Sequence, residues 1–152
     1  MLSEVCAEIR NYFTYSRDIH IADWVISNGI ITPSLDIPTN YIRIVGSRLN
    51  DGVHKVSEMQ LQDESFHGGI WIMSIPADFL SLVAEIETWQ ASNGNPDSMA
   101  MSPFSSESLG AYSYSKGSIS RNGSSIGGVV TWKDVYASRL NRYRKVNAYG
   151  FA

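Results

Sequence analysis

The sequence predicts an α+β fold in which N-terminal, central and C-terminal helices form a bundle, with a small antiparallel β module inserted between the first two helices. Three observations lead to this prediction. Apolar residues recur at helical spacing near both ends of the chain and after Pro76. Short β-branched runs separated by turn residues fill about 19–76. With 152 residues, of which 43% are hydrophobic and 18% charged, residues 1–152 are most simply one globular domain with a real core.

The first predicted helix covers residues 3–15. Apolar residues from Leu2 to Phe13 fall at helical spacing, and Glu4 is placed as a first-turn acid. Cys6 is the single cysteine, which excludes an intrachain disulfide. We expect it to be a small buried hydrophobe rather than a reactive thiol.

The β module is predicted from three groups of residues. Runs at 24–26 and 30–32 are separated by Ser-Asn-Gly, which favours a hairpin. The run from Tyr41 to Val56 contains Asn-Asp-Gly, where glycine tolerates positive φ and Asn and Asp bond their own backbone, so it predicts the central hairpin. Residues 70–75 are almost wholly apolar, which indicates a strand covered on both faces.

The second half of the chain is predicted to contain two helices separated by a long connection. Residues 57–67 are polar and are expected to form a surface loop, after which a helix runs from Asp78 to its stop at Asn93-Gly94. The segment from about residue 91 to residue 130 is rich in Ser and Gly, and we interpret it as an extended arm followed by a flexible loop. The last helix, about 131–146, begins with the capping-box pattern of Thr and Asp three residues apart.

Charge is distributed unevenly along the chain. The net charge is −3, but residues 1–130 carry 7 Lys/Arg against 14 Asp/Glu, whereas 131–152 carry 5 against 1. An acidic body with a basic end favours docking on another molecule through that end. A helix whose last turn complements its dipole explains the same pattern equally well. The acidic body disfavours sequence-specific nucleic-acid binding, and no apolar run approaches the roughly 18 residues of a membrane helix.

Residues that could carry catalysis or hold a metal do not cluster in the sequence. Asp63 and Glu64 with His67 form the only local group of metal ligands, and they fall in the predicted loop. No serine lies in a nucleophile elbow, and the glycines after Gly110 lack the spacing of a phosphate-binding loop. We therefore expect a protein that is not an enzyme, with no catalytic residues, no cofactor and no metal.

The motif SPFSSESLGAYSYSK at residues 102–116, followed by a Ser/Gly-rich loop and the helix sequence WKDVYASRLNRYRKV, carries a family resemblance. In its order of parts, this half of the chain resembles the C-terminal half of the head–tail connector proteins, or adaptors, of tailed bacteriophages and prophages. The stretch from Tyr41 to Pro76 is similar to that of connectors from phages of Gram-positive hosts. The resemblance covers most of residues 1–146.

The resemblance implies a structural subunit of the phage neck, located in the virion after synthesis in the host bacterial cytoplasm. Such subunits form a homo-oligomeric ring, usually dodecameric, that docks on the portal protein and receives head-closure or tail-completion proteins. DNA passes through the lumen without sequence-specific binding, and no membrane is involved. The simplest members are helical bundles, and this chain departs from them in its inserted β module.

The arm is the predicted contact between neighbouring subunits, because it alternates small residues with tyrosines that supply a large contact area. Glu107 would need a cation or backbone donors, and Arg139 or Arg142 of a neighbour would supply the cation. A solvated Glu107 and ordinary intrachain packing of the tyrosines remain alternatives. The predicted interface residues are Phe104, Glu107, Leu109, Gly110, Tyr112 and Tyr114.

The C-terminal helix and tail, residues 132–152, are predicted to contact the portal. The proposed contact residues are Arg139, Arg142, Tyr143, Arg144 and Lys145. Two other functions stay open. Another neck protein, such as a head-closure or tail-completion protein, is favoured by the central sheet, since these proteins are often strand-rich barrels. A soluble ligand-binding domain is supported only by generic aromatic residues.

Overall fold

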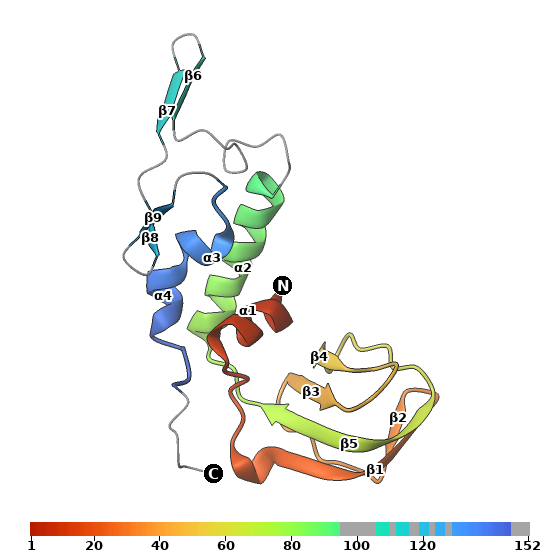
Figure 1. Cartoon of the computed structure of the whole chain (residues 1–152). Coiled ribbons are helices and arrows are strands. Elements are labelled where there is room, and N and C mark those ends of the chain that lie inside the picture. The colour runs from red at the N-terminus through yellow and green to blue at the C-terminus, as the bar shows by residue number, and fades with distance from the viewer. Residues whose placement is uncertain (95–105, 110–111, 116–118, 122–123, 127–128, 147–152) are drawn as a thin grey trace. The chain divides into compact units, whose positions relative to one another are not determined.

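A computed structural model describes residues 1–94, 106–109, 112–115, 119–121, 124–126 and 129–146 (Figure 1). The chain divides into two compact units. The first unit comprises Met1–Leu80 and Tyr143–Ala152, and the second comprises Ser81–Arg142. Among the described residues, no helix is long and apolar enough to cross a membrane.

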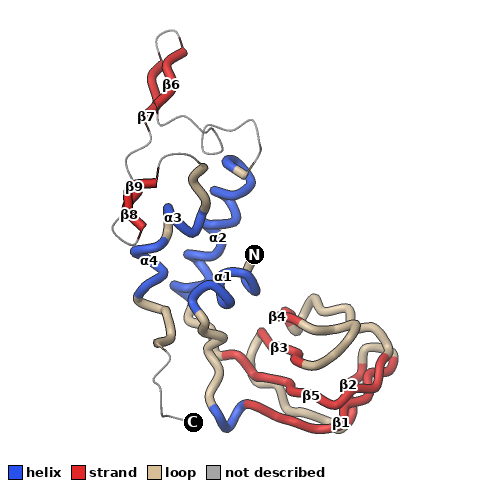
Figure 2. Tube along the Cα trace, in the orientation of Figure 1, coloured by secondary structure: helices blue, strands red, loops and turns tan. Residues whose placement is uncertain are grey.

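The first unit is built on one antiparallel sheet of five strands in the order β2-β1-β5-β3-β4 (Figure 2). The long strands β1 and β5 pair from Ile19 opposite Trp71 to Ile26 opposite Glu64, and β3 pairs with the other edge of β5. The sheet curls, as the ribbon in Figure 1 shows. The strands are β1 (Ile19–Ser27), β2 (Ile30–Thr32), β3 (Tyr41–Val45), β4 (Gly52–Lys55) and β5 (Glu64–Met73).

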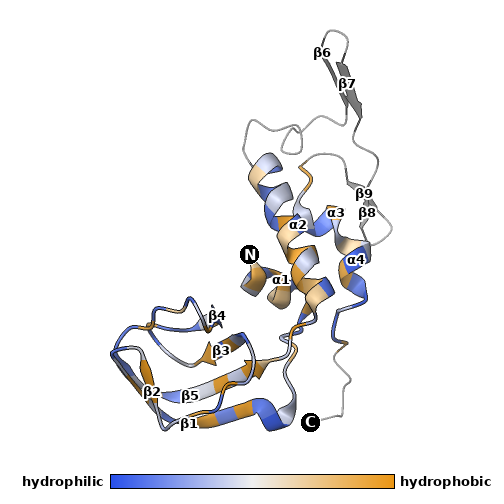
Figure 3. Cartoon of the chain, turned by 180° about the vertical axis from the view of Figure 1, so that it is seen from behind, coloured by the Kyte–Doolittle hydropathy of each residue, from blue (hydrophilic) through white to orange (hydrophobic). Residues whose placement is uncertain are grey.

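One face of the sheet forms the core of the first unit. In β3, Ile42 and Ile44 are fully buried while the residues between and beside them are only partly buried, as the period of two along a strand requires. They pack with Trp24 of β1 and Ile70 of β5, which are also buried. Apolar stretches along β1 and β5 are visible in Figure 3. Burying each of these side chains contributes about 2 kcal/mol of transfer free energy.

The first helix is shorter than predicted. Helix α1 spans Leu2–Ile9 and ends at Arg10, which adopts a left-handed conformation with φ 55°. The prediction that it continues to residue 15 is wrong. The side chain of Asn11 accepts a hydrogen bond from the backbone N–H of Phe13 (2.9 Å) and donates one to the carbonyl of Tyr143 (2.9 Å). Asn11 thus binds one nearby and one distant backbone group and stabilises a turn in place of a helix.

The predicted helical bundle is also wrong, because the fold is mostly the curled five-stranded sheet with a few short helices. Among the described residues, α2 (Ala77–Asn93) is the one long helix. The predicted C-terminal helix is interrupted at Tyr136 into α3 (Trp132–Val135) and α4 (Ala137–Asn141), and a 3₁₀ turn (Ser16–Asp18) precedes the sheet. Strand pairing between distant segments accounts for the difference: β1 begins before the predicted run, and β5 takes in residues 64–67 of the predicted loop.

Several local predictions are confirmed. Asn28 and Gly29, with φ 51° and 76°, form the turn between β1 and β2. The central hairpin of β3 and β4 exists, although it reverses over a longer loop, 46–51, than a tight Asp-Gly turn would need. Both halves of the capping box at Thr131 and Asp134 are present. Helix α2 lies where predicted, and its buried residues are Phe79, Leu82, Val83 and Ile86.

Candidate functional site

The arm predicted to contact neighbouring subunits and the predicted flexible loop after it each contain a short hairpin. Strands β6 (Ser106–Leu109) and β7 (Tyr112–Ser115) pair only with each other, as do β8 (Ile119–Arg121) and β9 (Ser124–Ile126). An isolated two-stranded hairpin is at best marginally stable in water. A further surface, supplied by this chain or by another, is therefore needed to stabilise the arm.

The predicted interface residues fall partly on the first of these hairpins. Four of them form two of its four cross-strand pairs, Glu107 with Tyr114 and Leu109 with Tyr112. The other two, Phe104 and Gly110, lie outside the described residues.

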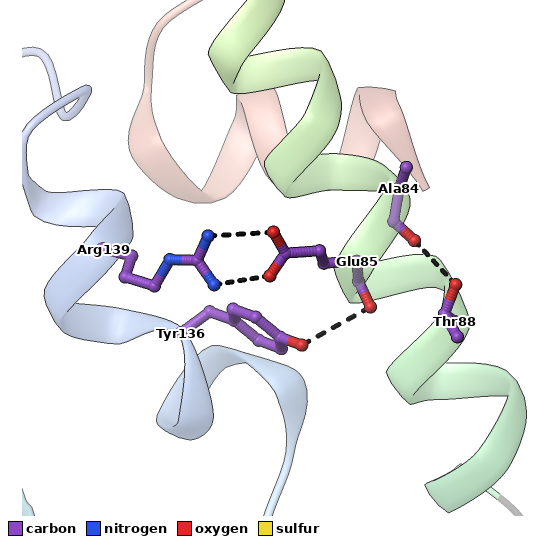
Figure 4. Close-up of polar contacts among 5 residues, drawn as sticks. All are labelled: Ala84, Glu85, Thr88, Tyr136 and Arg139. Atoms are coloured by element: carbon purple, nitrogen blue, oxygen red, sulfur yellow. Dashed lines mark hydrogen bonds and ion pairs between the residues drawn. The ribbon is translucent and has the colours of Figure 1, made fainter.

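Arg139, predicted to contact the portal or a neighbour's Glu107, binds a carboxylate of its own chain (Figure 4). Its Nη1 and Nη2 lie 2.5 and 3.1 Å from the two carboxylate oxygens of Glu85. The hydrogen bond from Arg139 lowers the pKa of Glu85. Tyr136 adds a ring contact 5.7 Å from the guanidinium and donates to the carbonyl of Glu85 at 3.4 Å. Both charged side chains are about half exposed, so the pair contributes little stability.

An open groove lies beside this ion pair, within the second unit. Its volume is about 680 Å³, and it runs along α2 past Glu85, Thr88 and Trp89 to Tyr136 of the C-terminal segment. The hydroxyl of Thr88 donates to the carbonyl of Ala84 at 3.0 Å and is occupied within the helix (Figure 4). The groove offers a contact surface of aromatic and small polar residues beside the Glu85 carboxylate.

The residues after α4 are fastened to the first unit. The Tyr143 ring packs 5.0 Å from Phe79 and 6.2 Å from Phe13, and its hydroxyl donates to the carboxylate of Asp78 at 2.5 Å. Arg144 donates to the carbonyl of Glu8 at 2.8 Å, with its other nitrogen 3.5 Å from the Glu8 carboxylate. Two of the proposed portal contacts are therefore engaged inside the chain.

The remaining two proposed portal contacts have exposed side chains. Arg142 ends the second unit just after α4. Lys145 donates its backbone N–H to the carbonyl of Ile9 at 3.0 Å, which joins this part of the chain to the last residue of α1. Within the proposed portal-contact set, Tyr143, Arg144 and Lys145 lie together on the first unit and Arg139 lies on the second.

The loop between β3 and β4 is held by the carboxylate of Glu64, a residue of the predicted surface loop 57–67. Glu64, the first residue of β5, accepts hydrogen bonds from the Ser47 hydroxyl at 2.5 Å, from the Arg48 and Leu49 amides at 2.7 and 3.3 Å, and from the Asn50 side chain at 3.0 Å. The loop therefore wraps around one carboxylate. In the sequence, the Asn-Asp-Gly pattern indicated the turn between the two strands. It did not indicate that Glu64 binds this loop, because Glu64 is distant from the loop in sequence.

Glu64 should make the stability of the protein pH-dependent. Its pKa is lowered, chiefly by the Ser47 hydrogen bond and then by the amides of Arg48 and Leu49. A depressed folded-state pKa means that the stabilisation is present above about pH 4.3, the usual value for glutamate, and is lost as pH falls through the folded-state pKa. Melting temperatures measured between neutral pH and pH 3 should therefore fall more steeply for the wild type than for Glu64→Gln. Glu87→Gln, which changes an exposed acid of α2, should keep the wild-type slope. Equal slopes in all three proteins would contradict this role for Glu64.

The only local group of metal ligands in the sequence is divided among separate contacts. Asp63 accepts a hydrogen bond from the Asn28 amide at 2.8 Å, and Glu64 binds the loop just described. His67 Nδ1 lies 2.7 Å from a carboxylate oxygen of Asp23, its cross-strand neighbour on β1. Within the described residues, no group of three or more His, Cys, Asp or Glu could hold a metal ion.

Cys6 is fully buried in α1, as predicted. Burial raises the pKa of its thiol to about 12, and the charge of Arg43 acts in the opposite direction. A thiol with so high a pKa stays protonated at neutral pH and is a poor nucleophile. Comparison of the chain with protein-family models, with curated proteins and with solved structures finds no match.

Proposed function

We propose that this protein is a structural subunit of the neck of a tailed phage, forming a ring that docks on the portal and joins the DNA-filled head to the tail. The observation that carries the proposal is the order of parts after Asp78: a long helix, an arm with the Glu-Ser-Leu-Gly-Ala-Tyr-Ser motif, a Ser/Gly-rich loop and a cationic C-terminal segment with two short helices. The resemblance to connectors also includes the strand-rich stretch 41–76, so it does not depend on a helical bundle.

The arm supports this proposal on physical grounds. Hairpins β6–β7 and β8–β9 are each separate from the five-stranded sheet, and each is too small to be stable alone. Tyr112 and Tyr114 supply large contact surfaces at little rotamer cost, as residues at the centre of an interface do. Packing against a neighbouring subunit would offset the entropy lost when this glycine- and serine-rich segment becomes ordered.

A head-closure or tail-completion protein is the second candidate. The curled antiparallel sheet of the first unit favours it, because such neck proteins are often strand-rich barrels. The two candidates differ in the protein that they touch. A connector binds the portal directly, whereas a head-closure or tail-completion protein binds the ring below the portal. Cross-linking within assembled particles, followed by identification of the linked protein, distinguishes them.

The test of the neck proposal is a Tyr112→Ser, Tyr114→Ser double variant, introduced into the phage or prophage that encodes the chain. Two interface anchors of this kind are each worth about 2 kcal/mol, so binding of the arm should weaken by more than a hundredfold. DNA-filled heads without tails should accumulate, counted by electron microscopy. Tyr15→Ser, at a tyrosine that is 60% exposed in the first unit, is the matched control and should leave joining intact.

Two further results complete the test. The double variant should keep the wild-type melting temperature, because β6 and β7 do not join the five-stranded sheet. Tailed particles at wild-type frequency would contradict the proposal. Deleting residues 142–152 would be a poorer test, since it removes the packing of Tyr143 against Phe13 and Phe79 and would destabilise the first unit itself.

A further inference from the structure

A second pocket, wholly within the first unit, is lined by several cationic side chains. Its volume is about 380 Å³, within the range of sites for small ligands. Arg10, Arg43 and Lys145 supply three cations to its lining, and Tyr12 and Trp71 supply aromatic rings. The lining contains no carboxylate. Such a pocket attracts anions and gives them donors to bind.

Arg43 is the centre of this pocket. It lies in β3 directly opposite Trp71 of β5, and its guanidinium carbon is 4.5 Å from the centre of the Trp71 ring and 3.7 Å from that of Tyr12. The two rings meet edge to face, 6.0 Å apart. These contacts hold the cation by its attraction to the ring faces. They leave its N–H groups without a carboxylate acceptor in the described part of the chain.

The charge of Arg43 is only partly exposed to water, and it is not neutralised by a nearby acid. Its neighbour on the other side in the sheet is Val53 of β4, an apolar residue. Glu8, an acid on α1, contacts Arg144. The guanidinium lies over the rings of Tyr12 and Trp71, and the Arg43 residue is only partly exposed. A guanidinium in these surroundings gains more from a bound anion than one in open water.

Arg10 and Lys145 are placed by backbone contacts. Arg10 is the left-handed residue that ends α1, and its N–H donates to the carbonyl of Ala7 at 3.1 Å. The amide of Lys145 donates to the carbonyl of Ile9 at 3.0 Å. Both cations therefore lie at the C-terminal end of α1, where the helix dipole favours positive charge. Lys145 is the residue that the C-terminal segment contributes to the pocket.

We propose that this pocket binds a carboxylate side chain of an acidic partner polypeptide, with the Arg43 guanidinium as the main donor. The planar guanidinium matches a carboxylate through two parallel hydrogen bonds. Residues 1–130 carry a net charge of −7, which repels an extended polyanion such as nucleic acid but tolerates a single carboxylate. The site does not depend on which assembly the protein joins.

The experiment is an NMR titration of the ¹⁵N-labelled full-length protein at low salt. The probes are a short blocked peptide with one glutamate among neutral residues, the same peptide with glutamine in place of that glutamate, and inorganic phosphate. The glutamate peptide should shift the indole N–H of Trp71 and the Nε–H of Arg43 saturably, and the glutamine peptide should shift neither. Arg43→Gln should weaken binding about tenfold, as expected for loss of a charge-assisted bond, and the exposed Lys145→Gln about threefold.

Arg48→Gln is the matched control, because it removes the same charge from an exposed loop of the same unit and should leave binding unchanged. If Arg43→Gln does not fold, the double variant of Arg10→Gln and Lys145→Gln replaces it as the test. Both of these side chains are exposed, so the substitutions should leave the fold intact. The double variant should weaken binding about tenfold. The proposal is overturned by the absence of saturable binding, by equal weakening in Arg48→Gln, or by tighter binding of phosphate than of the glutamate peptide.

Discussion

Gly68→Ala is expected to lower the free energy of unfolding by about 3 kcal/mol, the upper end for overpacking a core. A Cβ added at Gly68 would lie 2.2 Å from the carbonyl oxygen of Val45, an atom of the backbone that cannot rotate away. Strands β3 and β5 would have to separate locally. The carbonyl of Gly68 also accepts the indole N–H of the buried Trp24 at 3.0 Å, so movement of the backbone would disturb the core as well.

Chemical denaturation of Gly68→Ala and Gly69→Ala measures this effect with an adjacent control. A Cβ at Gly69 would meet the Nε1 atom of Trp71 at 2.9 Å, which is the end of a side chain that can shift. Gly69→Ala should therefore cost less stability, and it should change the Trp71 fluorescence because the indole moves. Equal stability losses in the two variants would show that the clash with the Val45 carbonyl is not the main cause of the loss in Gly68→Ala.

The glycines also show how far the sequence could predict the fold. Local signals identified the turn at Asn28 and Gly29, the long helix α2 and the cap at Thr131, because each depends on residues within one or two turns. The pair Gly68 and Gly69 carries no local signal. Glycine is needed at this pair because the backbone of Val45, which is distant in sequence, approaches it closely. Pairings between strands that are distant in sequence are the reason that the fold is mostly sheet.

The interface predictions met the same limit. The cations of the C-terminal segment were predicted to form one portal-contact set. The partners of two of them, Glu85 for Arg139 and Glu8 for Arg144, lie more than fifty residues away along the chain. Composition alone gave no means of separating these intrachain pairs from contacts with a portal. Arg43 was overlooked because its ring partners come from the segment predicted as helix and from a strand predicted as wholly covered.

Asn50→Ala is expected to cost about 3 kcal/mol and to lower the melting temperature by about 10 °C. The side chain is 3% exposed, and its oxygen accepts the amide of Gln62 at 2.7 Å while its nitrogen donates to the Gln62 carbonyl at 2.9 Å and to the Glu64 carboxylate at 3.0 Å. Truncation removes three hydrogen bonds and leaves buried backbone groups unpaired. Asn40→Ala, in an exposed loop, is the control for loss of an asparagine and should change the melting temperature little.

Asn50→Asp separates the hydrogen bonds of Asn50 from its shape. The substitution preserves the size of the side chain but places a second carboxylate about 3 Å from that of Glu64. Because two like charges raise the pKa of the pair, the variant should be least stable at neutral pH and should regain stability as one carboxyl is protonated on acidification. The wild type changes in the opposite direction over the same range, since it loses the charged Glu64 that its loop binds. Parallel pH profiles of the two proteins would show that Asn50 acts only through packing.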